Sequence, residues 1–173
     1  LRKVSQVTKS SNRITVQTTQ AMITEAIQKG SASITRILSP SDTLRTLYKA
    51  KGVQFKKSNI NPAGFFFRLS EVVIWDDDGN LSTTSDQIVA NGTIDITPTA
   101  TFNISIDDWQ LKYLQLSTTI SEDLDLRVRM NLLALDVKKK KEIYRAYLTP
   151  MTIFIGIVPV VITPVMTINV GAD

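Results

Sequence analysis

Alternation of apolar and polar residues is the dominant pattern along this chain, and it predicts β-strands. The clearest stretch is residues 94–107, where apolar residues occupy every second position. A period of two places successive side chains on opposite faces of a strand, so this segment is predicted to have one buried and one solvated face. Its apolar face consists of Ile94, Ile96, Pro98, Ala100, Phe102, Ile104 and Ile106.

The alternation returns in residues 124–137, with Leu124, Leu126 and Val128 on one face and charged residues on the other. The four lysines of residues 138–141 come next, followed by the strand-like residues 142–149. This order predicts a long hairpin whose turn is the lysine run. Shorter strands are predicted at residues 12–19, 32–38, 64–69 and 71–75, with Asp78-Gly79 as a tight turn and a return strand from Leu81.

Two segments in the N-terminal third have helical rather than strand spacing. Apolar residues at 22, 23, 26 and 27 predict a short helix over residues 20–29, capped by Thr19 and closed by Gly30. The second helix is predicted from Ser41 as N-cap to Gly52 as the residue after the C-cap. Its buried stripe would consist of Leu44, Leu47 and Tyr48.

Residues 146–172 contain no charged residue and are long enough to span a bilayer as a helix. Prolines at 150, 159 and 164 argue against a helix, because an interior proline costs a helix about 3 kcal/mol. We therefore expect an apolar hairpin of a soluble sheet, with its turn at residues 157–159, and consider membrane insertion unfavoured. The predicted core residues of this hairpin are Ile153, Ile155, Val161 and Ile162.

These patterns predict a mostly β fold: an antiparallel β-sandwich or a long-hairpin meander with one or two short α-helices near the N-terminal third. The 173 residues are expected to form a single β-rich domain, in which residues 1–55 form a helix-containing subregion. The chain begins at Leu1, and Gly171-Ala172-Asp173 directly follow a strand-like run. We therefore expect the sequence to be a segment of a longer protein.

Composition argues against an enzyme. The chain has no histidine and no cysteine, which removes the usual general base, the thiol nucleophile and the commonest zinc ligands, and we expect no cofactor. Glu122, Asp123 and Asp125 form a carboxylate cluster, but Asp123 and Asp125 alternate with Leu124 and Leu126, as solvent-facing strand residues do. The net charge of +4 equals the four-lysine run, so nucleic acid is not an expected partner.

Three kinds of candidate site remain. Asp76, Asp78 and Asn80 could ligate calcium, although the EF-hand spacing fails, because Ile74 and Ser85 would occupy its first and last ligand positions. An ordinary acidic turn is the alternative. Two aromatic residues could stack on sugar rings, and three asparagines lie in glycosylation sequons. These residues are Trp75 and Trp109 for sugars, and Asn80, Asn91 and Asn103 for glycosylation.

The segment Leu148-Thr149-Pro150, followed by residues 153–164, resembles a stretch of large, uncharacterised, β-rich secreted or surface proteins of bacteria. Residues 123–126 and the passage from Ile14 to Ile27 are similar in type. The resemblance implies an extracellular module and supplies no binding residues.

The expected function is therefore a non-enzymatic structural or adhesive module of a secreted or cell-surface protein or fibre. Such a module would bind other protein chains, its own copies included, by β-strand addition. Two alternatives stay open: a carbohydrate-binding module that contacts surface glycans through Trp75 or Trp109, and a membrane-active protein that inserts the hairpin at 150–170.

Overall fold

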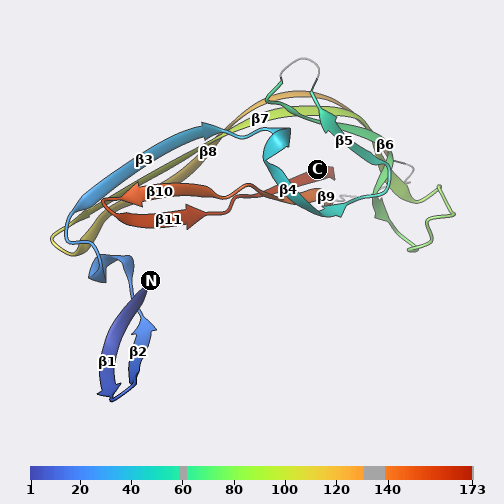
Figure 1. The fold of residues 1–173 in the computed structure, drawn as a ribbon. Helices are drawn as coiled ribbons and strands as arrows, with labels where there is room; N and C mark the ends of the chain where they lie inside the picture. Colours follow the sequence, from blue (N-terminus) through green and yellow to red (C-terminus); the bar gives the residue numbers. More distant parts are fainter. Residues whose placement is uncertain (59–61, 131–138, 173) are drawn as a thin grey trace. The chain divides into compact units, whose positions relative to one another are not determined.

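A computed structural model describes residues 1–58, 62–130 and 139–172, and the chain is mostly β-strand, as predicted (Figure 1). Two one-turn 3-10 helices, η1 (Ile23–Glu25) and η2 (Pro40–Asp42), are the only helices among these residues. The strands are β1 (Arg2–Ser10), β2 (Arg13–Gln20), β3 (Gly30–Ile37), β4 (Thr43–Lys49), β5 (Val53–Lys57), β6 (Phe65–Asp76), β7 (Gln87–Asp107), β8 (Gln110–Met130), β9 (Lys139–Leu148), β10 (Met151–Ile155), β11 (Val158–Ile162) and β12 (Val165–Ala172).

The strands form four sheets. Two are the hairpins β1-β2 and β10-β11, one has the order β12-β9-β4, and the largest has the order β3-β7-β6-β5, with β8 also paired to β7. The chain is divided into two compact units. Unit 1 contains Leu1–Thr35, Thr101–Ser117 and Thr152–Val161, and unit 2 contains Arg36–Ala100, Thr118–Met151 and Ile162–Asp173.

Unit 2 is a β-sandwich in which β4, β9 and β12 form one sheet and β5, β6 and β7 contribute to the other. Aromatic rings from the two sheets meet in its core. The ring of Tyr144 on β9 lies 5.0 Å from that of Phe67 on β6 and 5.2 Å from that of Phe55 on β5. Tyr144 and Phe67 are completely buried, so this aromatic cluster holds the two sheets together.

A close approach of β7 and β8 in unit 2 requires a glycine. Gly92 has φ +130, and a Cβ built on it would lie 1.9 Å from the carbonyl oxygen of Asp125 on β8. Opposite Gly92, the register of β6 shifts between Leu69 and Val72, where Glu71 has φ 50. The two strands predicted at 64–69 and 71–75 are therefore one strand, β6, with a bulge at Glu71.

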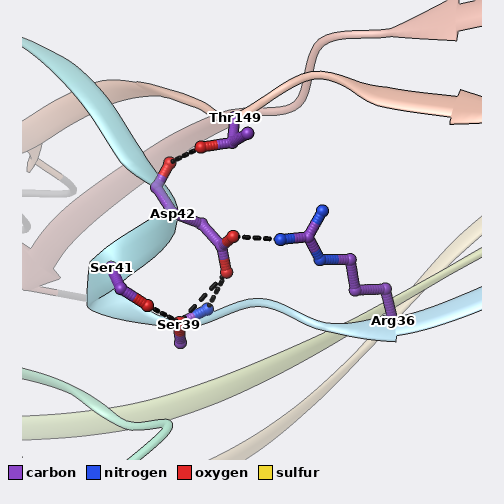
Figure 2. A network of polar contacts seen from close by, with 5 residues as sticks. All are labelled: Arg36, Ser39, Ser41, Asp42 and Thr149. Atoms are coloured by element: carbon purple, nitrogen blue, oxygen red, sulfur yellow. Dashed lines mark hydrogen bonds and ion pairs between the residues drawn. The ribbon is translucent and has the colours of Figure 1, made fainter.

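A buried carboxylate orders the corner between β3 and β4 in unit 2 (Figure 2). The Oδ1 atom of Asp42 forms an ion pair with the guanidinium of Arg36. Its Oδ2 accepts hydrogen bonds from the backbone N–H of Ser39 at 2.8 Å and from the Ser39 hydroxyl at 3.0 Å. A 2.7 Å hydrogen bond joins the hydroxyls of Ser39 and Ser41.

The backbone of Asp42 joins this corner to the end of β9. Its carbonyl oxygen accepts hydrogen bonds from the backbone N–H of Thr149 at 2.6 Å and from the Thr149 hydroxyl at 3.0 Å. Asp42 is only 7% exposed. Its charge is therefore largely removed from solvent and is paired with protein donors.

The two predicted helices are each reduced to a single 3-10 turn. The segment 20–29 contains only η1 (Ile23–Glu25), and Gly30 starts β3 instead of ending a helix. The segment from Ser41 contains only the end of η2 (Pro40–Asp42), after which β4 pairs with β9. The predicted buried stripe of Leu44, Leu47 and Tyr48 is exposed. Pairing with β9 satisfies the backbone of β4, and this overrides the helical spacing.

The predicted hairpin pairings need two corrections. Strand β8 pairs with β7 and lies in a different sheet from β9, so residues 124–130 and 142–148 are not a hairpin. Lys139, Lys140 and Lys141 begin β9 rather than form a turn, and residues 131–138 lie outside the described residues. Strands β6 and β7 do pair as predicted around Asp78-Gly79, but the return strand starts at Gln87 instead of Leu81.

The C-terminal apolar segment forms strands, as expected, but with three strands instead of two. Strands β10 and β11 pair around Gly156, and β12 leaves them to pair with β9. Ile153 and Ile155 are buried and Ile162 is partly buried, whereas Val161 is 61% exposed, which contradicts its predicted place in the core. Among the described residues, no helix is long and apolar enough to cross a membrane.

Unit 1 contains a smaller core and a polar ladder. The core consists of Ile27, Phe102, Ile104, Ile106, Ile153 and Ile155. On the opposite face of β7, the Asn103 side chain accepts a 2.6 Å hydrogen bond from Ser33 on β3 and donates one at 3.1 Å to Gln115 on β8. The predicted division of residues 94–107 into an apolar and a polar face is therefore confirmed.

Candidate functional site

Strand β8 is a long edge strand. It has 21 residues, nearly all exposed, and it pairs with β7 and with no other described strand. An unpaired edge presents a row of backbone N–H and C=O groups that another strand can bind. The alternation that was predicted to bury one face of residues 124–130 is present, but Leu124, Val128 and Met130 are 41–52% exposed.

An open apolar groove lies beside this edge in unit 2. Its volume is about 300 Å³, and it lies between β8 and the facing strand β12. The side chains of Ile120, Leu124 and Leu126 line it from β8, and Ile168 and Val170 line it from β12. The groove is therefore an incompletely closed side of the sandwich core, next to a free strand edge.

The hairpin β1-β2 of unit 1 also presents apolar side chains to solvent. Both strands are exposed along their whole length, and Val4, Val7, Ile14 and Val16 are 50–63% exposed. A lone two-stranded hairpin is at best marginally stable in water. Residues 1–20 carry Arg2, Lys3, Lys9 and Arg13 and no acidic residue, so the hairpin is an apolar surface with a positive charge.

The acidic loop between β6 and β7 brings together two of the three predicted calcium ligands. Carboxylate oxygens of Asp76, Asp78 and Asp86 lie within 4.8 Å of one another. Asp86 was missed because it is eight residues from Asp78 in sequence and only the pairing of β6 with β7 brings it close. The predicted ligand Asn80 instead accepts a hydrogen bond from the backbone N–H of Ser82 at 3.2 Å.

Hydrogen bonds within the loop occupy part of this carboxylate cluster. The Asp78 carboxylate accepts hydrogen bonds from the backbone N–H of Asn80 at 2.7 Å and from the Thr83 hydroxyl at 3.0 Å. These bonds, chiefly that from Asn80, hold the pKa of Asp78 below its usual value. The Oδ1 atoms of Asp76 and Asp86 are buried without a partner in the described residues. Three such carboxylates have the chemistry to ligate a divalent cation.

The two predicted sugar platforms differ. Trp75 is partly buried, packs against the core of unit 2, and has the ammonium of Lys139 5.7 Å from its ring centroid, so its face is not open to a sugar. Trp109 is 49% exposed in the turn between β7 and β8, where Asp108 and Trp109 both have positive φ.

The three sequons lie in different surroundings. Asn80 is exposed in the acidic loop. Asn91 is partly buried, and its amide donates a 2.8 Å hydrogen bond to Glu71. The Asn103 amide is engaged in the polar ladder of unit 1.

The carboxylates of Glu122, Asp123 and Asp125 are exposed on β8. The alternation predicts this for Asp123 and Asp125, whereas Glu122 has the parity of Leu124 and lines the groove beside it. All three form an acidic segment without an intervening base: residues 113–126 contain these three acids and no lysine or arginine.

Comparison of the chain with protein-family models, curated proteins and solved structures found no match. The proposed function therefore rests on the local geometry of the chain.

Proposed function

We propose that this chain is a non-enzymatic extracellular module, structural or adhesive, that assembles with further copies of itself by β-strand addition at β8. The observation that carries the proposal is the free, exposed edge of β8 next to an open apolar groove. Main-chain hydrogen bonds to such an edge supply affinity, and the apolar groove beside it selects alternate side chains of the added strand. The secreted or cell-surface location is part of the proposal and rests on the sequence resemblance.

The donor in this proposal is the β1-β2 hairpin of a second copy. Its strands have nine and eight residues, a length suited to the part of β8 in unit 2, residues 118–130. Its exposed valines and isoleucine would enter water-free surroundings in the groove. Its four positive charges complement Glu122, Asp123 and Asp125 in the part of this β8 segment that precedes Arg127 and Arg129, and such complementarity selects the partner and its register.

An assembly of this kind joins one surface of a copy, the β8 edge, to a different surface of the next copy, the β1-β2 hairpin. Contacts of this heterologous type generate rings or open filaments instead of closed two-fold dimers. A filament is the form expected of a fibre subunit, so the proposed contact and the proposed role are consistent with each other.

Sedimentation velocity over a range of protein concentrations tests the proposal. We expect concentration-dependent association that weakens with salt, because the charge pairs are solvent-exposed at the rim of the contact. Ile120→Lys, which places a charge at a 52% exposed groove position, is expected to abolish association. The control Leu81→Lys, at a 63% exposed loop position, should leave association unchanged.

A charge exchange identifies the donor. The pair Lys9→Glu and Arg13→Glu in the hairpin should block self-association, and adding Glu122→Lys and Asp125→Lys to the same chain should restore it. A chain that stays monomeric at every concentration and salt refutes strand addition. Association that survives Ile120→Lys would show that a different surface is used.

A further inference from the structure

A second, larger groove lies on the outer face of unit 2, formed by β5, β6 and β7. Its volume is about 650 Å³, which is within the range of small-molecule binding pockets. Its side chains alternate along the strands with core residues. Phe66, for example, lies between the fully buried Phe65 and Phe67, so the groove is on the sheet face opposite the core.

Three cations line this groove. Lys56, Lys57 and Arg68 are exposed, and the structure gives none of them an ion pair or hydrogen bond with another described residue. Among the described residues of the lining, Asp95 has the only carboxylate, and it accepts a 2.5 Å hydrogen bond from the Ser58 hydroxyl. Three cations against one carboxylate give the groove a positive potential, which attracts anions.

The strand register places an aromatic ring among these charges. Phe66 is directly paired with Lys56 on one side and with Asp95 on the other. Arg68, two residues along the same face, is paired with Gln54 and Thr93. Phe66 is partly exposed, unlike its buried neighbours. It is therefore a flat apolar surface with cations on the same sheet face.

The bulge in β6 supplies polar groups to the same groove. Ser70 and Asn91 line it where the register of β6 against β7 shifts. Gly92, which has no side chain, lies beside them. Hydroxyl and amide groups therefore adjoin the aromatic ring and the cations.

We propose that this groove binds an acidic saccharide, one whose sugar rings carry carboxylates. The apolar face of a sugar ring would pack on Phe66, and its carboxylate would pair with Arg68 and Lys56 through charge-assisted hydrogen bonds. Asp95 and Ser70 would hydrogen-bond sugar hydroxyls, as would the Asn91 side-chain N–H that is not bonded to Glu71. A nucleic-acid strand fits less well, because Asp95 would face its phosphates and one partly exposed ring offers little base stacking. This proposal is independent of self-assembly at β8, because it uses the opposite face of the sheet.

Isothermal titration calorimetry with a galacturonic-acid trisaccharide tests the proposal, with maltotriose as the neutral control and a single-stranded thymidine oligonucleotide as the anionic control. We expect the acidic trisaccharide to bind and the two controls to bind at least about tenfold more weakly, because maltotriose lacks the charge and the oligonucleotide lacks pyranose rings that carry carboxylates. Backbone amide NMR signals of Ser70, Asn91 and Gly92 should shift on titration.

Arg68→Met and Phe66→Leu should each weaken this binding severalfold or more, whereas Lys9→Met, which removes a positive charge outside the groove, should not. Unchanged amide NMR spectra away from the groove would show that the variants fold. Any one of four results would overturn the proposal. The folded wild-type chain does not bind the trisaccharide, it binds maltotriose equally well, it binds the oligonucleotide more tightly, or the two groove variants have no effect. The Ile120→Lys variant should bind the trisaccharide normally, so this test and that of self-assembly fail separately.

Discussion

Replacing Asp42 with asparagine should destabilise unit 2 by about 2–3 kcal/mol. The substitution keeps the size of the side chain and removes the negative charge that pairs with Arg36 and accepts two hydrogen bonds from Ser39. Removing one partner of a buried ion pair costs about 3–5 kcal/mol. The Arg36 side chain is 38% exposed and can turn toward water, which reduces that cost. The amide oxygen of asparagine can still accept the bond from the Ser39 backbone N–H, which reduces the cost further.

Denaturant unfolding at neutral pH measures this loss, with the two tryptophans as probes of the two units. Trp75 belongs to unit 2 and Trp109 to unit 1, so a Trp109→Phe background leaves Trp75 as the only tryptophan reporter. The unfolding midpoint should fall while the slope with denaturant stays the same, because a changed midpoint at constant slope reports stability.

A surface ion pair provides the matched control for Asp42→Asn. Asp107 pairs with Lys29 at 3.2 Å, and the two side chains are 52% and 79% exposed. Asp107→Asn should cost less than about 0.5 kcal/mol, because exposed ion pairs contribute little. The control is read from Trp109 in a Trp75→Phe background, because Asp107 lies in unit 1. If Asp42→Asn cost no more than this control, the buried carboxylate would not be stabilising the corner of β3 and β4, and the reasoning would be wrong.

Three further predictions concern backbone, core and pH. Gly92→Ala should lower stability by about 3 kcal/mol or more, because its Cβ would overlap the Asp125 carbonyl. Gly79 also has positive φ but open space around it, so Gly79→Ala should cost about 1–2 kcal/mol. Equal losses of stability in urea unfolding would contradict this prediction. Ile155→Ala should cost unit 1 about 2–5 kcal/mol, measured by Trp109 fluorescence, and an effect as small as that of the exposed Val161→Ala would place Ile155 outside the core. Because the folded pKa of Asp78 is lowered from 3.8, its contribution to loop order should be complete above pH 3.8 and lost as the pH falls through the lower folded value. A carboxyl-carbon NMR titration checks this, and a folded pKa at or above 3.8 would refute it.

The alternation of apolar and polar residues was sufficient to predict the strand class and the faces of β7, because parity decides which side chains of a strand face the core when that strand packs on one. It was not sufficient to predict pairing. Residues 124–130 were assigned to a hairpin with the next strand in sequence, but β8 pairs with the strand before it. Local spacing contains no information about which edge a strand will meet, and turn residues gave the correct partner for β6 with β7 and for β10 with β11.

The helical spacing of Leu44, Leu47 and Tyr48 failed for a related reason. Short segments have weak intrinsic preferences, and the pairing of β4 with β9 satisfies a whole row of backbone groups. The acidic loop was half predicted, since Asp76 and Asp78 are neighbours in sequence while Asp86 joins them only through strand pairing. The groove with Phe66 and Arg68 was not predicted, because its residues come from three strands and only their register places them together.

The composition of unit 1 has a consequence for how the chain folds. The unit is assembled from Leu1–Thr35, Thr101–Ser117 and Thr152–Val161, so its contacts join residues that are far apart in sequence. Folding slows as the sequence separation of contacting residues increases. During synthesis from the N-terminus, the first segment leaves the ribosome long before Ile153 and Ile155 exist to cover Ile27. Ile27 is therefore without its core partners until residues 152–161 have been synthesised, and a chain is most exposed to premature association in this period.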